Sequence, residues 1–490
     1  MPTAPGTTPS RLRLPPPRFD PLIVVVVALV VRLPLVLAER GVLFDDGVYG
    51  ISVIDMRRGL APYSEVFSSQ GPLHYPLLRL GDLLGFETAP APRLTPLLAG
   101  ILTAVAVRGI ARRLGTGRGP ALTAALLCAT AGSMIRSTAN ITGDAPALAL
   151  ATGAVWAAVA HRDRPRLRSA LLTGALIGGA LAVKPLAGTA LVPIVCWLHG
   201  GRAPRPALRD LTAAGSAAIA TWVATALPWG LGPVWNQSIA YHLGDGPEPT
   251  KVSHLVKLFT VVPERDALVV VAAALALVAT LTGRAATDVR RTDAVAIAVW
   301  SGTTAVVLVL QQALYGNHFV NLVVALCCAY AVRPPPARWL AVGVIVATPW
   351  WLWNTHAFFR PAGWSPTERA LLSDLRALPT GSLGIADEPG FLWRAGLATP
   401  PLMNDTARAR IDQGDLTTES LVRAAVTPGA CAVVIWTERF DRHLPGLRPA
   451  LAAADYQPTA RYGHGRELWV RAACRGDRTP AAAEPPRSPD

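Results

Sequence analysis

The chain has 490 residues, of which 51% are hydrophobic and only 16% are charged, and its mean hydropathy is +0.35. Soluble proteins carry about a quarter of their residues as charges, so this composition excludes an ordinary soluble enzyme. The formal net charge of +14 would suggest nucleic acid as a partner of a soluble protein. We expect no nucleic acid here, because the arginines gather in short segments between apolar blocks.

Apolar segments of roughly 16–24 residues recur as far as Asn354, and a helix of about that length crosses ~30 Å of hydrocarbon. The first, Pro21–Ala38, is followed by nothing like the small-residue site at which a signal peptide is cleaved. We therefore predict that it is retained as a span of the lipid bilayer. Eleven spans are expected in all, at residues 21–38, 91–113, 119–136, 144–160, 169–183, 185–200, 208–231, 266–283, 293–313, 317–332 and 338–354.

Arginines cluster in every second gap between these spans. Such a bias is typical of cytoplasmic loops, so we expect the N-terminus in the cytoplasm and, with an odd number of spans, the C-terminal segment outside. Trp350, Trp351 and Trp353 at the end of the last span suit the membrane interface on that side. A chain rich in Ala and Arg with only three lysines favours a GC-rich bacterial genome, and hence a bacterial plasma membrane.

Two outer stretches are too long to be simple connections. The first, residues 39–90, contains two amphipathic segments, at 48–60 and 73–86. We predict that both are helices lying in the membrane interface. The second stretch covers residues 359–475 and is predicted to be a soluble domain.

Helix and strand patterns alternate in 359–475 and predict a small α/β domain. The expected fold class is an all-α polytopic membrane domain at 19–358 followed by this extracytoplasmic α/β domain. The chain ends, 1–18 and 476–490, are rich in Pro, Arg and Ser and are expected to be disordered. The predicted elements of the outer domain are helices at 367–377, 417–425 and 447–454, strands at 382–387 and 432–437, and a hairpin around 463–465 that ends in 467–472.

The outer domain has two cysteines, Cys431 and Cys474, one just before a predicted strand and the other after one. If those strands are antiparallel neighbours, their ends meet, and an oxidising compartment permits a disulfide. Two unpaired thiols are the alternative. The other four cysteines lie within predicted spans, where we expect them to be small packing residues.

Ionisable groups in or beside a membrane are costly, so they are functional candidates. Acids that face a lysine and an arginine suit a reaction that needs a general base and a place for an anionic leaving group. The predicted topology brings such groups from five regions of the chain to the level of the outer interface. They are Asp45, Asp46, Arg136, Asp144, Lys184 and His318.

The three acids also have structural interpretations. Asp45 or Asp46 can cap the amphipathic helix that follows them, and Asp144 can be the N-cap of a span with proline just inside it. Together the three could hold a hard divalent cation. The histidines show no zinc spacing.

The basic candidates have structural interpretations as well. Lys184 can extend its ammonium to the interface, and Arg136 can neutralise Asp144. His318 can be an interfacial or packing histidine. The convergence of all these groups at one depth is what favours a common site.

The first outer loop carries a more specific pattern. An acidic pair at residues 44–49 (FDDGVY) leads into the first interfacial segment, which ends in residues 59–63 (GLAPY). This order resembles the GT-C membrane glycosyltransferases, in particular the glycosyltransferase family 39 group, which includes protein O-mannosyltransferases and lipid A aminoarabinose transferases. In that group a Lys-Pro-Pro-like motif opens the second interfacial helix. This chain has residues 70–73 (QGPL) there, so Gln70 replaces the basic residue.

Later matches to the group are looser. Asp144 resembles its second acid at the start of a span, and Lys184-Pro185 resembles its lysine-containing turn. Residues 315–326 resemble its Tyr/His-rich span entry. The resemblance covers roughly residues 20–355, together with the plan of a C-terminal outer domain.

The resemblance implies a transferase that takes a hexose or pentose from a polyprenyl-phosphate donor on the outer face. The sugar would pass to a protein, polysaccharide or lipid acceptor in a single inverting displacement. Asp45 would by preference be the general base, Lys184 and Arg136 would stabilise the phosphate, and Asp46 or Asp144 would orient hydroxyl groups. A monophosphate leaving group makes a metal less necessary. Further substrate contacts are expected from Tyr63, Gln70, His74 and His318.

A transporter or flippase of a lipid-linked or small anionic substrate is the main alternative. Its site is expected near the bilayer midplane, between inverted repeats. A scaffold protein with a sensory outer domain is a second alternative, but it does not need acids and a lysine at one depth. The clustering at one interface therefore favours the transferase.

Overall fold

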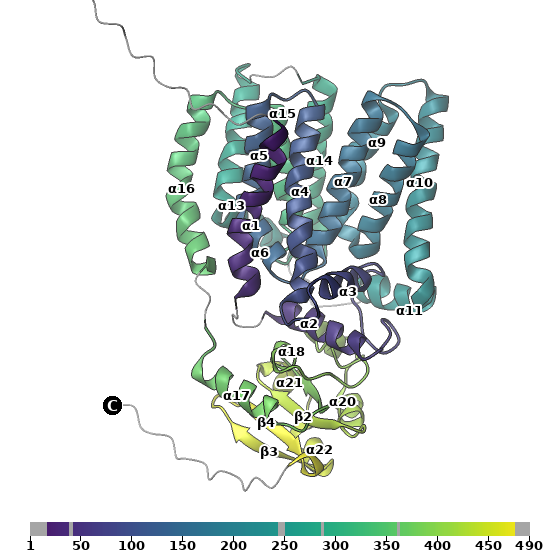
Figure 1. Ribbon diagram of the computed structural model, residues 1–490, viewed down its shortest axis with the longest axis vertical. Helices are drawn as coiled ribbons and strands as arrows, with labels where there is room; N and C mark the ends of the chain where they lie inside the picture. Colours follow the sequence, from purple (N-terminus) through teal and green to yellow (C-terminus); the bar gives the residue numbers. More distant parts are fainter. Residues whose placement is uncertain (1–16, 39–42, 244–249, 286–288, 360–362, 476–490) are drawn as a thin grey trace, which may run out of the picture.

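The computed structural model describes residues 17–38, 43–243, 250–285, 289–359 and 363–475. A bundle of helices carries a small region of strands and short helices at one end (Figure 1). Most of the termini predicted to be disordered lie outside the described residues. Pro17 and Arg18 are described, and they belong to a short 3-10 turn.

Apolar segments form helices because a chain in hydrocarbon must satisfy its backbone polar groups internally. Among the described residues, four helical stretches are long and apolar enough to cross a membrane, and a bent pair of helices makes a fifth. The protein is therefore a multi-pass membrane protein. The bundle consists of α1 (Asp20–Leu37), α4 (Leu94–Arg113), α5 (Arg118–Thr130), α6 (Gly132–Ala139), α7 (Asp144–Asp163), α8 (Leu167–Val183), α9 (Leu191–His199), α10 (Pro204–Ala226), α13 (Lys251–Leu281), α14 (Arg291–Leu310), α15 (Val320–Val332) and α16 (Ala337–Phe359).

Each of the eleven predicted ranges coincides largely with helix in these elements. Three of the helical stretches, Leu167–Val183, Pro185–His199 and Val320–Val332, are apolar but shorter than 18 residues. The number of eleven crossings therefore stays a prediction. Three short helices after α10 lie outside the predicted ranges or at their edge, namely α11 (Leu231–Trp235), a π-helical turn (Asn236–Ala240) and α12 (Tyr241–Leu243).

The prediction of one helix at 119–136 is wrong, because α5 and α6 meet at Ala131, which is extended (ψ 131°). A buried carboxylate accounts for the break. Asp266 accepts the backbone N–H of Ser133 at 2.9 Å and its hydroxyl at 2.5 Å, so it satisfies an amide at the start of α6. The next helix, α7, is bent by 117° relative to α6.

Helix α13 begins at Lys251, well before the predicted start of that span at residue 266. It contains a kink at Asp266 (φ −121°, ψ 34°), three residues after Pro263. Pro263 removes a backbone donor and crowds the turn that precedes it, so it weakens the helix just before the kink. Arg265 at the kink donates to the carbonyl of Gly316 at 3.1 Å, so the kink joins α13 to the segment before α15.

The first outer loop contains α2 (Phe44–Arg57) and α3 (His74–Leu84), close to the two predicted interfacial helices. The segment before α3 lies on the end of α8, because Gly71 donates to the carbonyl of Val183 at 3.0 Å and Leu73 to that of Ala182 at 2.9 Å. A Cβ atom at Gly71 would lie 2.3 Å from the Ala182 oxygen, so only glycine permits this approach.

The C-terminal region, residues 363–475, has a four-stranded sheet in the order β1-β2-β4-β3. β1 and β2 are parallel, and the other two pairs are antiparallel. Each predicted helix and strand lies within a few residues of an observed one, and the short helices α18, α19 and α21 are additional. The elements are α17 (Pro366–Arg376), β1 (Leu383–Ala386), α18 (Gly390–Ala395), α19 (Arg408–Asp412), α20 (Thr418–Ala425), β2 (Ala430–Ile435), α21 (Glu438–His443), α22 (Leu447–Ala453), β3 (Tyr456–Arg461) and β4 (Glu467–Arg471).

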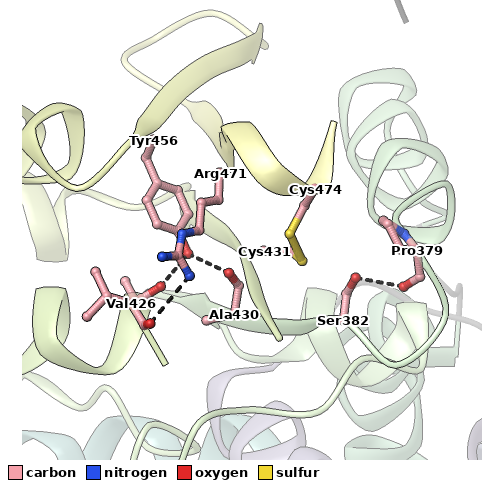
Figure 2. Close-up of a disulfide and its surroundings, with 9 residues drawn as sticks. Pro379, Ser382, Val426, Ala430, Cys431, Tyr456, Arg471 and Cys474 are labelled. Carbon is pink, nitrogen blue, oxygen red and sulfur yellow. Dashed lines mark hydrogen bonds between the residues drawn. A yellow bond between two sulfur atoms is a disulfide. The ribbon is translucent and has the colours of Figure 1, made fainter. Parts of the chain in front are cut away.

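Cys431 and Cys474 are joined by a disulfide, with their Cα atoms 5.6 Å apart (Figure 2). Cys431 lies at the start of β2, and Cys474 lies in a 3-10 turn just beyond the end of β4. Because β2 and β4 are antiparallel neighbours, the start of one strand lies beside the end of the other. The disulfide links residues that are 43 positions apart.

The C-terminal region packs directly on α2. A Cβ atom at Gly47 would lie 2.3 Å from the backbone nitrogen of Gly390, so α18 and α2 approach closely. Farther along α2, Asp55 accepts the backbone N–H of Thr399 at 2.9 Å and its hydroxyl at 2.5 Å. The first outer loop is therefore held between the helical bundle and the C-terminal region (Figure 1).

Candidate active site

The two neighbouring acids of the first turn of α2 have different surroundings. Helix α2 begins at Phe44 with Leu43 at its N-cap, and no side chain caps it. The interpretation of Asp45 or Asp46 as a helix cap is therefore wrong. Both carboxylates do lie in the first turn, where the helix dipole favours negative charge.

Asp46 is buried in a network within the protein. Its carboxylate forms an ion pair with Arg93, and one oxygen accepts the backbone N–H of Ile141 at 2.8 Å. Arg93 also donates to the carbonyl of Val36 at 3.1 Å. Asp46 thus ties α2 to the end of α1 and to the segment between α6 and α7.

Asp45 is exposed and faces a cavity of about 440 Å³, to whose wall the buried Asp46 also contributes. The surrounding protein limits the solvation of the Asp45 carboxylate, and this desolvation raises the pKa of Asp45 to about 6. Lys184 lowers the pKa and Asp144 raises it, which places both charges within electrostatic reach. The residues that line the cavity are Leu43, Phe44, Asp45, Asp46, Arg136, Ser137, Asn140, Thr142, Arg265, Tyr315, Gly316, Asn317 and Arg439.

Two arginines from the helical bundle line the same cavity. Arg136 lies on α6, beside the 117° bend, and Arg265 lies at the kink of α13. Arg136 was among the residues predicted for the site, whereas Arg265 was not. Charged residues beside Pro263 in an otherwise apolar helix were the signal that could have identified it.

Asp144 forms a polar cluster next to the cavity. Its Oδ2 atom accepts from Lys184 Nζ at 2.8 Å and from the side-chain amide of Asn317 at 2.7 Å. Its Oδ1 atom is buried and has no hydrogen-bond partner among the described residues. Asp144 is the first residue of α7 and makes no side-chain cap, so the capping interpretation does not hold. Its salt bridge is with Lys184, from the turn after α8.

Gln70 and His74 adjoin the segment that leads to Asp144. A Cβ atom at Gly143 would lie 2.8 Å from Gln70 Oε1 and 3.6 Å from His74 Nδ1. His74 is fully buried, neither ring nitrogen has a partner among the described residues, and its ring packs edge-on to Tyr49 at 4.7 Å. Burial lowers the pKa of His74 to about 3, so the imidazole is neutral near pH 7.

The remaining candidates lie around these groups. Tyr63 donates its hydroxyl to the carbonyl of Gln70 at 2.7 Å, so it supports the loop rather than lining the cavity. His318 is nearly buried beside Asn317 and packs edge-on to Tyr315 at 5.4 Å. Tyr315, Gly316 and Asn317 line the cavity, although their sequence predicts only the entry of a span.

The C-terminal region also contributes to the cavity, which no sequence pattern predicts. Arg439, on α21, lines it with its guanidinium 4.1 Å from the centre of the Phe44 ring. Arg439 is held there by a hydrogen bond to the carbonyl of Asp387. The cavity is therefore bounded by the membrane helices, the first outer loop and the C-terminal region.

A cluster of metal ligands is not found in the part of the chain that the structure describes, where no group of three or more His, Cys, Asp or Glu side chains is arranged to hold an ion. Two of the three acids considered for a hard cation have basic partners instead, namely Arg93 for Asp46 and Lys184 for Asp144.

Residues 69–229 match a family model described as dolichyl-phosphate-mannose-protein mannosyltransferase. No curated protein sequence matches the chain.

Among solved structures, the chain is similar to ArnT from Cupriavidus metallidurans in the apo state and bound to undecaprenyl phosphate. The TM-score is 0.65 in both cases, the identities are 15% and 14%, and each match covers 93% of this chain and 99% of that one. The S. cerevisiae protein O-mannosyltransferase Pmt1-Pmt2 complex bound to the sugar donor matches over 46% of this chain and 35% of that one, with a TM-score of 0.39 and 17% identity. The chain thus has the fold of ArnT along nearly its whole length, and the resemblance to GT-C glycosyltransferases is confirmed.

Proposed function

We propose that this protein is a membrane glycosyltransferase that moves a sugar from a polyprenyl-phosphate donor to a hydroxyl group of an extracytoplasmic acceptor. The observation that carries the proposal is the position of the Asp45 carboxyl in one cavity with the guanidinium groups of Arg136 and Arg265. A base and a site for an anion thereby lie side by side. The fold shared with ArnT supports the same class of reaction.

A polyprenyl-phosphate sugar suits this cavity because its phosphate is anionic and its lipid chain belongs in the membrane. Arg136 and Arg265 supply two cations from the membrane helices. One of the similar ArnT structures is described as bound to undecaprenyl phosphate, which supports a donor of this chemical class. The proposal covers an acceptor that is a protein, a polysaccharide or a lipid.

The reaction is a single displacement at the anomeric carbon of the donor. The acceptor oxygen forms a bond to this carbon, the bond from the carbon to the phosphate oxygen breaks, and the configuration is inverted. Asp45 takes the proton of the acceptor hydroxyl. The electron pair of the broken bond stays on the departing polyprenyl phosphate, whose charge Arg136 and Arg265 stabilise.

Asp144 and Lys184 have supporting roles in this proposal. Lys184 is engaged by Asp144, so we assign it to the positioning of that carboxylate rather than to the leaving phosphate. The buried Oδ1 atom of Asp144, which has no partner among the described residues, is placed to accept a hydrogen bond from a sugar hydroxyl. Neutral His74, which is fully buried next to Gln70 and Gly143, supports the segment that carries Asp144.

The proposed topology follows the arginine pattern. Eleven crossings with a cytoplasmic N-terminus put the C-terminal region, and with it this cavity, on the outer side of a bacterial plasma membrane. Donor lipids that have been flipped to the outer leaflet would then reach the cavity from the bilayer.

The test is transfer of radiolabelled sugar by the full chain in liposomes, with polyprenyl-phosphate mannose, glucose, galactose, arabinose and aminoarabinose as alternative donors. The wild type is expected to use at least one donor, and Asp45→Asn is expected to reduce that transfer by about 10²–10⁴-fold. The matched control is Asp441→Asn, which alters an acid on the C-terminal region that pairs with Arg448 outside the cavity. Near-normal transfer by Asp45→Asn would exclude Asp45 as the base, and no transfer by the wild type from any donor would exclude the function.

A further inference from the structure

A second cavity lies at the far end of α7 from Asp144. Helix α7 has 20 residues, so its two ends are separated by about 30 Å, the thickness of a bilayer core. The second cavity has a volume of about 590 Å³ and opens between the ends of α4, α7 and α8. The residues that line it are Arg113, Ala160, Asp163, Arg164, Arg166, Arg168 and Ser169.

The charges of this cavity are not balanced. Its one acid, Asp163, is paired with Arg162 at 2.7 Å and lies 3.6 Å from Arg113. The other three cavity arginines are Arg164, Arg166 and Arg168, and no ion pair is found for them within the described ranges. Three guanidinium groups therefore line a hollow whose one acid is already paired with other arginines.

Hydrogen bonds support the backbone of the segment that carries these arginines at Arg166. Ser169 donates its hydroxyl to the carbonyl of Arg166 at 2.7 Å, and His161 Nδ1 lies 2.9 Å from the same hydroxyl. His161 is fully buried, and its Nε2 atom lies 3.2 Å from Asp210. A segment that is already ordered loses little conformational entropy when it binds a ligand.

The surface beside the cavity is apolar. Leu167 and Leu171, four residues apart on α8, are neighbours on the helix surface and are exposed, as is Leu172. Arg168 lies at the same end of α8, within the cavity. A ligand that fills the cavity with phosphate can thus lay an alkyl chain along α8.

We propose that this cavity binds the phosphate headgroup of an anionic phospholipid of the leaflet opposite the Asp45 cavity. By the arginine pattern this is the cytoplasmic leaflet, where anionic lipids attract basic segments at the membrane surface. Arg164, Arg166 and Arg168 bind the phosphate oxygens, and the acyl chains lie on the leucines of α8. The site is separate from the proposed transfer reaction and does not depend on it.

The experiment is native mass spectrometry of the purified full chain in detergent with added diphosphatidylglycerol, phosphatidylglycerol or phosphatidylcholine. The wild type is expected to retain the two anionic lipids in preference to phosphatidylcholine. The triple variant Arg164→Ala/Arg166→Ala/Arg168→Ala is expected to bind diphosphatidylglycerol about 100-fold more weakly, since each basic residue near the surface contributes about fivefold. The triple Lys variant at the same positions is expected to retain most of the binding, which keeps the test decisive if the Ala variant folds poorly.

The matched control is Arg205→Ala/Arg290→Ala/Arg291→Ala, which removes the same charge from exposed positions outside the cavity. This control is expected to bind diphosphatidylglycerol as the wild type does. Equal binding by the cavity variant and the wild type, or an equal loss in the control, would overturn the proposal. Inorganic phosphate is the second probe. If the wild type binds it as tightly as it binds the anionic lipid, the proposal is overturned, because the ligand would then be free phosphate.

Discussion

The guanidinium of Arg93 forms an ion pair with the carboxylate of Asp46 in the interior, where the two side chains are 1% and 2% exposed. Asp45, its neighbour in the same helical turn, faces the cavity. Two adjacent acids are thereby separated into a structural and a candidate catalytic residue, and the two roles can be tested independently.

Asp46→Asn is expected to destabilise the protein, because the buried Arg93 charge loses its anion. Breaking a buried pair in this way costs about 3–5 kcal/mol. The measurement is the thermal unfolding midpoint of the purified chain in detergent, with Asp45→Asn as the control that keeps the midpoint near that of the wild type. A stable Asp46→Asn protein without transferase activity would instead identify Asp46 as the base.

Lys184→Met is expected to reduce kcat by about 10²-fold, because Asp144 loses the cation that holds its carboxylate in place. Steady-state transfer kinetics check this, with Lys257→Met as the control, since Lys257 is a lysine of α13 that does not line the cavity. An unchanged kcat with an increased KM for the donor would point to direct phosphate binding by Lys184 instead.

The rate of transfer is expected to depend on the ionisation of Asp45. Desolvation raises its pKa to about 6, and the deprotonated form is the base, so kcat/KM should be constant above about pH 7 and fall about tenfold per unit well below pH 6. The measurement is a profile of kcat/KM between pH 5 and 8, with unfolding midpoints recorded at each pH. A flat profile over a range in which the protein stays folded would contradict the assignment.

Arg439→Ala is expected to raise KM for the acceptor by about 10–100-fold while leaving the fold intact, because one charge-assisted contact is lost from the cavity. Its control is Arg442→Ala, on the same helix, where the arginine pairs with Glu438 at the surface. Equal kinetics of the two variants would show that the C-terminal region takes no part in substrate binding.

The Cys431–Cys474 disulfide is expected to stabilise the C-terminal region by about 2–4 kcal/mol, since it closes a loop between residues 43 positions apart. Intact mass under non-reducing and reducing conditions should differ by two hydrogen atoms, and Cys431→Ala/Cys474→Ala should lower the unfolding midpoint. Cys196→Ala, at an exposed free cysteine, is the control. It should change neither the mass difference between the two conditions nor the unfolding midpoint. Identical masses under the two conditions would mean that the thiols are not linked.

Much of the fold could be predicted from the sequence, because apolar residues recur with a characteristic spacing in each helix and strand. The apolar blocks, the two interfacial helices and the predicted elements around Ser382–Ala425 and Cys431–Arg471 correspond closely to observed elements. The same local pattern failed at Ala131, where the carboxylate of Asp266, 133 positions from Ser133 in the sequence, binds the start of α6. Such contacts are not written in any one segment.

For the candidate site, the sequence by itself determined which residues were worth considering, because ionised groups at a membrane interface are rare and costly. Only the tertiary structure decided how they are used. It paired Asp46 with Arg93 and Asp144 with Lys184, and it left Asp45 facing the cavity. It also brought Arg265 and Arg439 to that cavity from distant parts of the chain. The physical reason is that charge and polarity are properties of a residue, whereas burial and partnership are set by neighbours that only folding brings together.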